Sequence, residues 1–99
     1  MRLTNVQRET IKGVTKELFG SDAEVKLFGS RLDDAAKGGD IDLLVVSEAL
    51  IKNKVQKALY MVARLQVKLG DQPIDVLVVD PETALTAVHR QALRAGETL

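Results

Sequence analysis

Cysteine is absent from the 99 residues, which excludes a disulfide framework and a thiolate metal site. An excess of one charge is absent too: 14 Lys and Arg balance 14 Asp and Glu, and the zero net charge argues against a nucleic-acid partner. No apolar run approaches the ~20 residues that span a membrane, and the N-terminus lacks the apolar segment of a signal peptide. We therefore expect a cytoplasmic protein with no membrane partner.

Internal repeats, linkers and low-complexity tracts are also missing, and the hydrophobic content of 45% suits one compact domain over residues 1–99. A domain of this length buries roughly two-thirds of the surface that its unfolded chain exposes, which is enough for a modest core.

Apolar residues recurring every three or four positions predict three helices. The first covers residues 4–19, the second is about twenty residues long, and the third ends near residue 95. Each helix has a start and a stop signal in the sequence. In chain order these are Thr4 and Gly20, Ser47 and Gly70, and Asp80–Pro81 and Gly96.

Three apolar segments, at residues 24–29, 40–46 and 73–80, predict strands. The helix between the second and third strands makes them parallel neighbours in one sheet. The element order α-β-β-α-β-α therefore predicts an α/β (α+β) fold, in which helices pack on a three-stranded mixed sheet.

Carboxylates interrupt two of these strands at corresponding positions. Asp40 and Asp42 open the second strand, and Asp75 lies near the start of the third. Parallel pairing brings all three to one end of the sheet. If the first strand runs antiparallel to the second, Gly29 and Ser30 at its C-terminal end join them there.

Such a cluster is costly without a cation. Like charges 5–7 Å apart at an effective dielectric near 20 repel by roughly 2.5 kcal/mol per pair. Either a carboxyl takes up a proton, or a metal ion binds among Asp40, Asp42 and Asp75. Hard oxygen ligands suit Mg²⁺ or Mn²⁺, and two ions about 3.5–4 Å apart would fit. The alternative is that each aspartate is simply a solvent-exposed residue at the end of a strand, with no metal-binding role.

Gly29 and Ser30 supply a complementary anion site. Glycine permits a close backbone approach, and Ser30 offers its hydroxyl and N–H to a phosphate oxygen. A helical turn starting at Arg31 would point its positive end at the same anion. Arg31 and Lys37 are candidate phosphate contacts, and simple solvated charge is the alternative for each.

Gly29-Ser30, nine residues, then Asp40-Ile41-Asp42, with Asp75 in a later strand, resembles the nucleotidyltransferase superfamily of the DNA polymerase β type. More closely, the chain is similar to the minimal nucleotidyltransferases (MNT), which are antitoxins paired with HEPN toxins.

The resemblance implies transfer of AMP from ATP to a hydroxyl, with release of pyrophosphate and with two Mg²⁺ ions. Asp40, Asp42 and Asp75 would ligate metal and act as the catalytic carboxylates, with Asp75 helping to deprotonate the attacking hydroxyl. Gly29, Ser30 and Arg31 would bind the nucleotide phosphates. The role of Asp33 and Asp34, between the basic residues of this turn, stays open.

The resemblance also implies a partner, a cognate HEPN toxin, which would be neutralised by AMP transfer to a hydroxyl, with a tyrosine as the expected acceptor. Two alternatives remain. The chain neutralises the toxin by binding alone, or it is an accessory nucleotidyltransferase acting on a small molecule. The last two helices have more apolar surface than a small core can bury. A homodimer, or a hetero-oligomer with the toxin, would cover this surface.

We expect structural roles for the other residues that could carry chemistry. His89, the one histidine, is expected at the boundary of the last helix rather than in catalysis. Tyr60, the one tyrosine, is expected to pack or to contact a partner. The lysines of the second helix are expected to form its solvated face.

Overall fold

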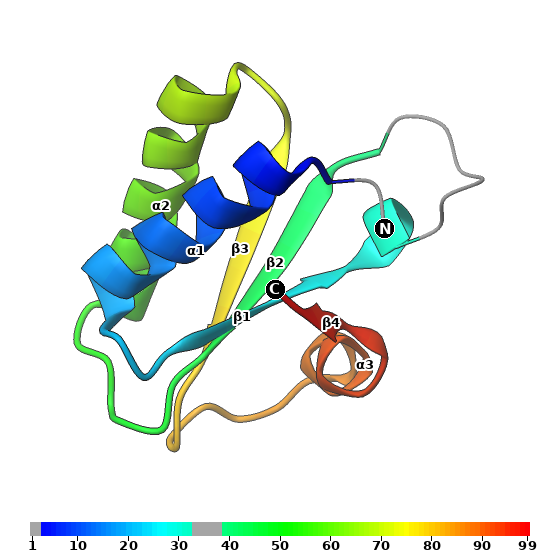
Figure 1. Ribbon diagram of the computed structural model, residues 1–99. Helices are drawn as coiled ribbons and strands as arrows, with labels where there is room; N and C mark the ends of the chain where they lie inside the picture. The colour runs from blue at the N-terminus through cyan, green and yellow to red at the C-terminus, as the bar shows by residue number, and fades with distance from the viewer. Residues whose placement is uncertain (1–2, 33–38) are drawn as a thin grey trace.

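The computed structural model describes residues 3–32 and 39–99 of the chain. Within these two ranges, three α-helices, one 3₁₀ turn and four strands follow one another (Figure 1). They are α1 (Asn5–Phe19), β1 (Glu24–Phe28), η1 (Gly29–Leu32), β2 (Ile41–Val46), α2 (Lys54–Leu69), β3 (Ile74–Val79), α3 (Ala87–Ala95) and β4 (Glu97–Thr98).

The four strands form one mixed sheet in the order β3-β2-β1-β4. β2 and β3 are parallel, as the connectivity predicted. β1 is antiparallel to both of its neighbours, so the condition under which Gly29 and Ser30 join the aspartates is met. β4 is an addition to the expected three strands. It has two residues, which are too few for a periodic sequence pattern. It forms because the chain beyond α3 returns to β1. There, the N–H of Leu99 donates to the carbonyl oxygen of Val25 at 3.0 Å.

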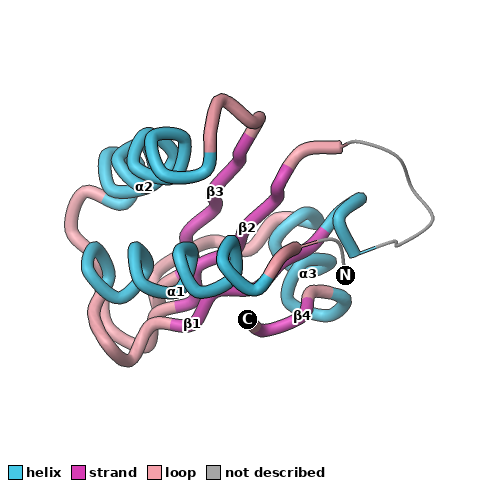
Figure 2. Tube along the Cα trace, turned by 45° about the horizontal axis from the view of Figure 1, so that its top comes forward, coloured by secondary structure: helices cyan, strands magenta, loops and turns pink. Residues whose placement is uncertain are grey.

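Helices cover both faces of the sheet: α1 and α2 pack on one face, and α3 packs on the other (Figures 1 and 2). The strands alternate accordingly. Ile41, Leu43 and Val45 of β2 enter the main core under α1 and α2, whereas Leu44 contacts the smaller cluster with Ala92 of α3. Asp42 therefore lies on the α3 face of the sheet.

The first helix has the ends that its sequence predicted. The Thr4 hydroxyl accepts from the N–H of Gln7 at 3.0 Å, and the Gln7 side chain accepts from the N–H of Thr4 at 2.9 Å. This reciprocal pair satisfies two N–H groups at the helix start. Gly20 ends the helix with a φ of 98°, a backbone angle that glycine adopts without strain.

The predicted start of the second helix is wrong. Ser47 is not its cap, because the Ser47 hydroxyl donates to the carbonyl oxygen of Ala49 at 2.7 Å and forms a local turn. α2 begins only at Lys54, after Asn53 in the left-handed conformation, and is 16 residues long rather than about twenty. Its end before Gly70 is confirmed.

The predicted start of the third helix is also wrong: α3 begins at Ala87, capped by Thr86, and not at Asp80–Pro81. The Asp80 carboxylate accepts from the backbone N–H of Glu82 at 3.0 Å, but this bond closes a turn. The same carboxylate accepts from the N–H of Ile51 at 3.0 Å and from Lys54 Nζ at 3.1 Å, so it clamps the β2–α2 loop to the end of β3. Tertiary contacts thus replace the local helix cap.

The last two helices keep apolar side chains at the surface, as expected. Val55, Leu59 and Val67 of α2 and Val88 of α3 are all more than half exposed. Within residues 3–32 and 39–99, none of the helices combines the length and the apolarity needed to cross a bilayer.

The Asp80 clamp should make stability depend on pH in strong acid. Hydrogen bonds from Ile51, Lys54, Thr83 and Glu82 lower the pKa of Asp80 from 3.8 to about 2, against the opposing effect of burial. The stabilisation is therefore complete above pH 3.8 and is lost as the pH falls through about 2. Chemical denaturation should show a smaller loss of unfolding free energy over this range for Asp80→Asn than for the wild type. The exposed Asp22→Asn is the control and should retain the wild-type slope.

Candidate functional site

Three carboxylates meet at the end of the sheet where β2 and β3 begin. Asp42 of β2 and Asp75 of β3 are direct partners in the parallel register, and Asp40 immediately precedes β2. One carboxylate oxygen from each residue lies within 4.8 Å of the other two. The structure thus brings together the three aspartates that the sequence analysis singled out.

At the centre of the cluster, the surroundings of Asp42 disfavour its ionised form. Asp42 is half-buried, whereas Asp40 and Asp75 are exposed. Burial raises the pKa of Asp42, and the charges of Asp75 and Asp40 raise it further. Each cause acts against the ionised form, so a cation among these oxygens would stabilise the carboxylates.

The donor set fits a hard divalent cation. Three carboxylates supply oxygen ligands only, and Mg²⁺ binds through one or a few carboxylates together with substrate phosphates. Two of the three side chains are exposed, which leaves room for water and substrate oxygens beside the protein ligands.

Gly29 borders the cluster, and both its backbone conformation and the lack of space for a side chain require glycine at this position. β1 and β2 pair Phe28 with Asp42, so the next residue, Gly29, reaches the Asp42 side chain. The φ of Gly29 is +77°, and a Cβ at this position would collide with the Asp42 carboxylate. Gly29 therefore lies directly against the Asp42 carboxylate, and its expected approach to a phosphate stays a prediction.

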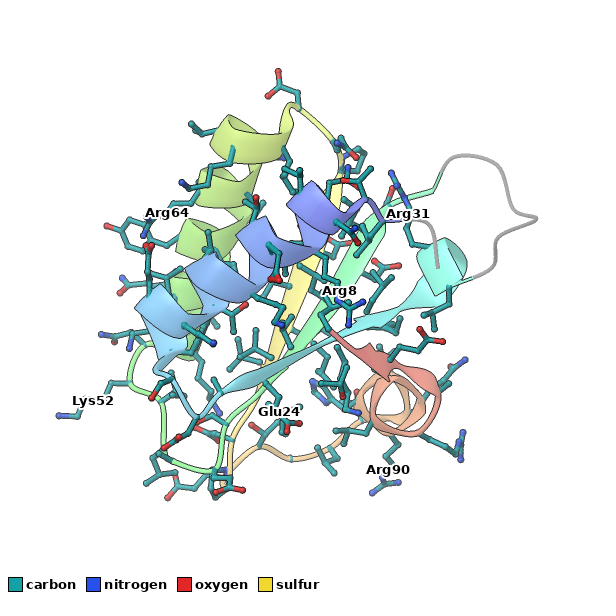
Figure 3. The ribbon with its side chains drawn as sticks, in the orientation of Figure 1. Arg8, Glu24, Arg31, Lys52, Arg64 and Arg90 are labelled. Atoms are coloured by element: carbon teal, nitrogen blue, oxygen red, sulfur yellow. The ribbon has the colours of Figure 1, made fainter. Side chains whose placement is uncertain are left out.

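Arg31 links three segments at the same end of the sheet (Figure 3). From η1, its Nε donates to the carbonyl oxygen of Gly39 at 3.3 Å, before β2, and its Nη2 donates to Gln72 Oε1 at 3.1 Å, before β3. Arg31 thus positions the backbone around the carboxylates. Gln72 is a residue that sequence reasoning missed, because no local pattern marks a contact 41 positions away.

Several other predicted residues lie at the limit of the described structure. The backbone of Ser30 belongs to η1, which ends at Leu32, so the helical turn expected from Arg31 is a single 3₁₀ turn in the described part. The candidate residues Asp33, Asp34 and Lys37 lie outside the described residues.

His89 has a structural role, as expected. Its Nδ1 accepts from the backbone N–H of Thr86 at 3.0 Å, which caps α3 and leaves the ring proton on Nε2. Tyr60 lies on the exposed face of α2 and is available to a partner.

Gly29→Ala should disturb the cluster as well as the backbone. Positive φ costs about 1 kcal/mol for alanine, and Gly20→Ala, with a φ of +98° and open space around its Cβ, is a matched control for that cost. We expect Gly29→Ala to lose more unfolding free energy than Gly20→Ala, because only the former displaces the Asp42 carboxylate. Equal losses in chemical denaturation would contradict a tight fit of Gly29 against Asp42.

The fold is similar to that of a chain in the crystal structure of a toxin–antitoxin pair, MntA–HpeT, crystallised as a mutant with two aspartates, two positions apart, replaced by glutamate. The TM-score is 0.69 at 18% identity, and the match covers 92% of this chain and 70% of the other. Among curated proteins, no sequence matches the chain.

A family match covers almost the whole chain. The nucleotidyltransferase domain matches residues 8–96, a range that includes η1, the three carboxylates and both parallel strands. The chain belongs to the nucleotidyltransferase domain family.

Proposed function

We propose that this protein is an MNT-type antitoxin, a Mg²⁺-dependent nucleotidyltransferase that moves AMP from ATP to a hydroxyl, on a tyrosine, of a cognate HEPN toxin and thereby neutralises it. The observation that carries the proposal is the meeting of Asp40, Asp42 and Asp75 within 4.8 Å, at the end of β2 and β3 and against the backbone of Gly29.

The carboxylates divide the work according to their positions. Asp40, Asp42 and Asp75 hold the Mg²⁺, which when bound neutralises the charge of the triphosphate. Gly29 and Ser30 bind phosphate oxygens through their backbone N–H groups, and Arg31 keeps the surrounding segments in place.

Asp75 is exposed and accepts the proton of the attacking hydroxyl. The hydroxyl oxygen forms a bond to the α-phosphorus, the bond from this phosphorus to the bridging oxygen breaks, and pyrophosphate leaves. The protein contributes positioning and charge complementarity, which dominate phosphoryl-transfer catalysis.

Two observations support the toxin as acceptor. The fold is similar to that of a chain from a toxin–antitoxin pair whose two replaced aspartates have the same spacing as Asp40 and Asp42. In addition, the exposed apolar side chains of Val55 and Leu59 on α2 line the same groove as Asp75 and offer a protein-binding surface.

The exposed apolar surface equally favours a second candidate, an antitoxin that acts by binding alone. The carboxylates distinguish the two functions. A pure binder gains nothing from a half-buried aspartate whose charge is opposed by burial and by two neighbours. An accessory enzyme for a small-molecule acceptor would need the carboxylates but not the apolar surface.

Labelling with α-³²P-ATP and Mg²⁺, together with the toxin encoded beside this gene, tests the activity. We expect label on the toxin, and a loss of roughly two orders of magnitude in its rate for Asp42→Asn. Asp71→Asn, an exposed change in the loop before β3, is the control and should label normally. If Asp42→Asn still neutralises the toxin and label never transfers, the binding-only function is correct.

Thermal melting tests the cation site without any partner. Mg²⁺ should raise the melting midpoint of the wild type by several degrees, because it binds the folded cluster and not the unfolded chain. Asp42→Asn should be more stable than the wild type in the absence of Mg²⁺, by about 1 kcal/mol after solvent screening, and should respond little to the ion. A midpoint that Mg²⁺ leaves unchanged in the wild type would contradict the site.

A further inference from the structure

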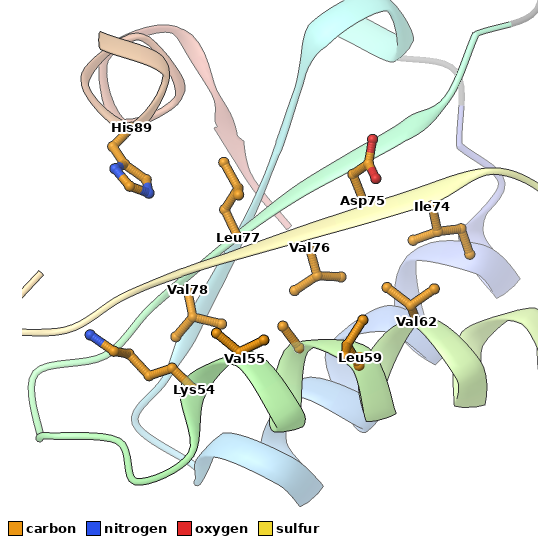
Figure 4. Close-up of a pocket in the computed structure, with 11 residues that line it drawn as sticks. Lys54, Val55, Leu59, Val62, Ile74, Asp75, Val76, Leu77, Val78 and His89 are labelled. Carbon is orange, nitrogen blue, oxygen red and sulfur yellow. The ribbon is translucent and has the colours of Figure 1, made fainter. Parts of the chain in front are cut away.

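A groove of about 540 Å³ runs along the outer edge of β3, between α2 and α3 (Figure 4). Its lining is apolar except at three places: Lys54 at one end, His89 on the α3 side, and Asp75 of the carboxylate cluster. The groove and the proposed catalytic end of the sheet are therefore continuous.

The floor of this groove is an open strand edge. Across the part of the chain that the structure describes, β3 is the last strand of the sheet on its side. The carbonyl oxygens of Pro73 and Val79 accept from β2 and its end, at Ile41 and Ser47. Alternate residues of a strand direct their N–H and C=O groups to the same side. The odd-numbered residues of β3 thus face β2, and Ile74, Val76 and Val78 direct their backbone groups outward, into the groove.

The two walls of the groove differ in chemistry. Val76 and Val78 point toward α2, where Val55 and Leu59 are 74% and 64% exposed, whereas Leu77 and Asp75 point to the α3 side (Figure 4). A strand added at this edge would place alternate side chains on these two walls.

Unpaired backbone groups on a strand edge are satisfied best by another extended backbone. Neither a helix laid in the groove nor a small molecule offers donors and acceptors at the strand repeat. The position of Asp75 on one wall adds a further requirement: the occupant must bring its reactive group to that wall.

We propose that the groove holds an extended segment of the acceptor protein, paired with β3 as an additional strand, with its acceptor hydroxyl on the Asp75 wall and apolar side chains on either side of it against Val55 and Leu59. This inference rests on the proposed function and specifies its substrate: a hydroxyl residue between apolar neighbours in an extended segment. Adjacent strands lie about 4.8 Å apart, so a residue opposite Asp75 has its hydroxyl within reach of the cluster. Acidic residues beside the hydroxyl are disfavoured by Asp40, Asp42 and Asp75.

A synthetic peptide of about nine residues, alternating valine with threonine, is a suitable probe because it matches the strand repeat and the two walls. Titration into the ¹⁵N-labelled protein should shift the backbone amides of Val76 and Val78. Two isomers of the peptide, N-methylated at alternate positions, separate backbone pairing from simple apolar contact. One isomer should bind like the parent and the other should not bind, since only one set of N–H groups faces β3 in a strand. Equal binding of both isomers, or no binding of the parent peptide, would overturn the proposal.

Leu59→Lys and Val55→Lys test the α2 wall. Each should weaken peptide binding by about tenfold, since a buried aliphatic contact is lost. Val67→Lys changes an apolar residue of the same helix that is 87% exposed and outside the groove, so it should leave binding unchanged. The exposure of all three side chains lets the fold tolerate the changes. Equal effects at the three positions would contradict docking in the groove.

Failure of this inference is distinguishable from failure of the proposed function. If the peptide shifts Val76 and Val78 but label never reaches the toxin, the groove binds a strand and the transferase activity is wrong. If the toxin is labelled at the wild-type rate by Leu59→Lys, the activity stands and the docking proposal is wrong. Protection of the Val76 and Val78 amides that grows with protein concentration, together with a dimer in sedimentation, would assign the groove to a second copy of the chain and overturn the proposal.

Discussion

The in-register parallel pairing of β2 with β3 places Asp42 directly opposite Asp75, and the rest of the site depends on it. A slip by one residue would move Asp75 to the opposite face of the sheet and bring an apolar side chain into its place. The pairing is held in register by burial, because Ile41, Leu43 and Val45 enter the main core from the same strand. The hydrophobic pattern that stabilises the fold therefore also brings like charges together.

The two ends of β2 and β3 show how environment decides the behaviour of an aspartate. At the C-terminal end, Asp80 is surrounded by hydrogen-bond donors and by Lys54, and its pKa is lowered to about 2. At the N-terminal end, burial and two neighbouring carboxylates raise the pKa of Asp42. The protein's own donors satisfy the charge of Asp80, and these bonds hold the β2–α2 loop against the end of β3. Under the proposed function, a bound cation would satisfy the charge of Asp42.

The open edge of β3 complements this polar end of the sheet. β1 is covered by β2 on one side and by β4 on the other, whereas β3 has a neighbour on one side within the described chain. α2 exposes aliphatic side chains toward this edge, and α3 contributes His89 from the other side. A single strand thus carries both Asp75 and an open edge, so the proposed catalytic carboxylate and the proposed pairing edge lie next to each other.

Much of this arrangement was predictable from the sequence by itself. Thr4 and Gly20 mark the ends of α1 through contacts within a few residues, and the helix between two apolar strands requires a parallel pair. That pair by itself requires Asp40, Asp42 and Asp75 to lie at one end of the sheet. The spacing of Gly29 and Ser30 from these aspartates indicated the family.

Tertiary structure alone decided the rest. Asp80–Pro81 is a strong local signal for a helix start, yet Asp80 bonds instead to Ile51 and Lys54, which are 29 and 26 positions away. The link from Arg31 to Gln72 and the pairing of β4 with β1 likewise join distant segments. The exposed edge of β3 exists because no other described strand reaches it. Local hydrogen bonds and hydrophobic periodicity depend on residues that are close in the sequence. The long-range contacts and the open edge depend instead on which surfaces the folded sheet brings together or leaves open.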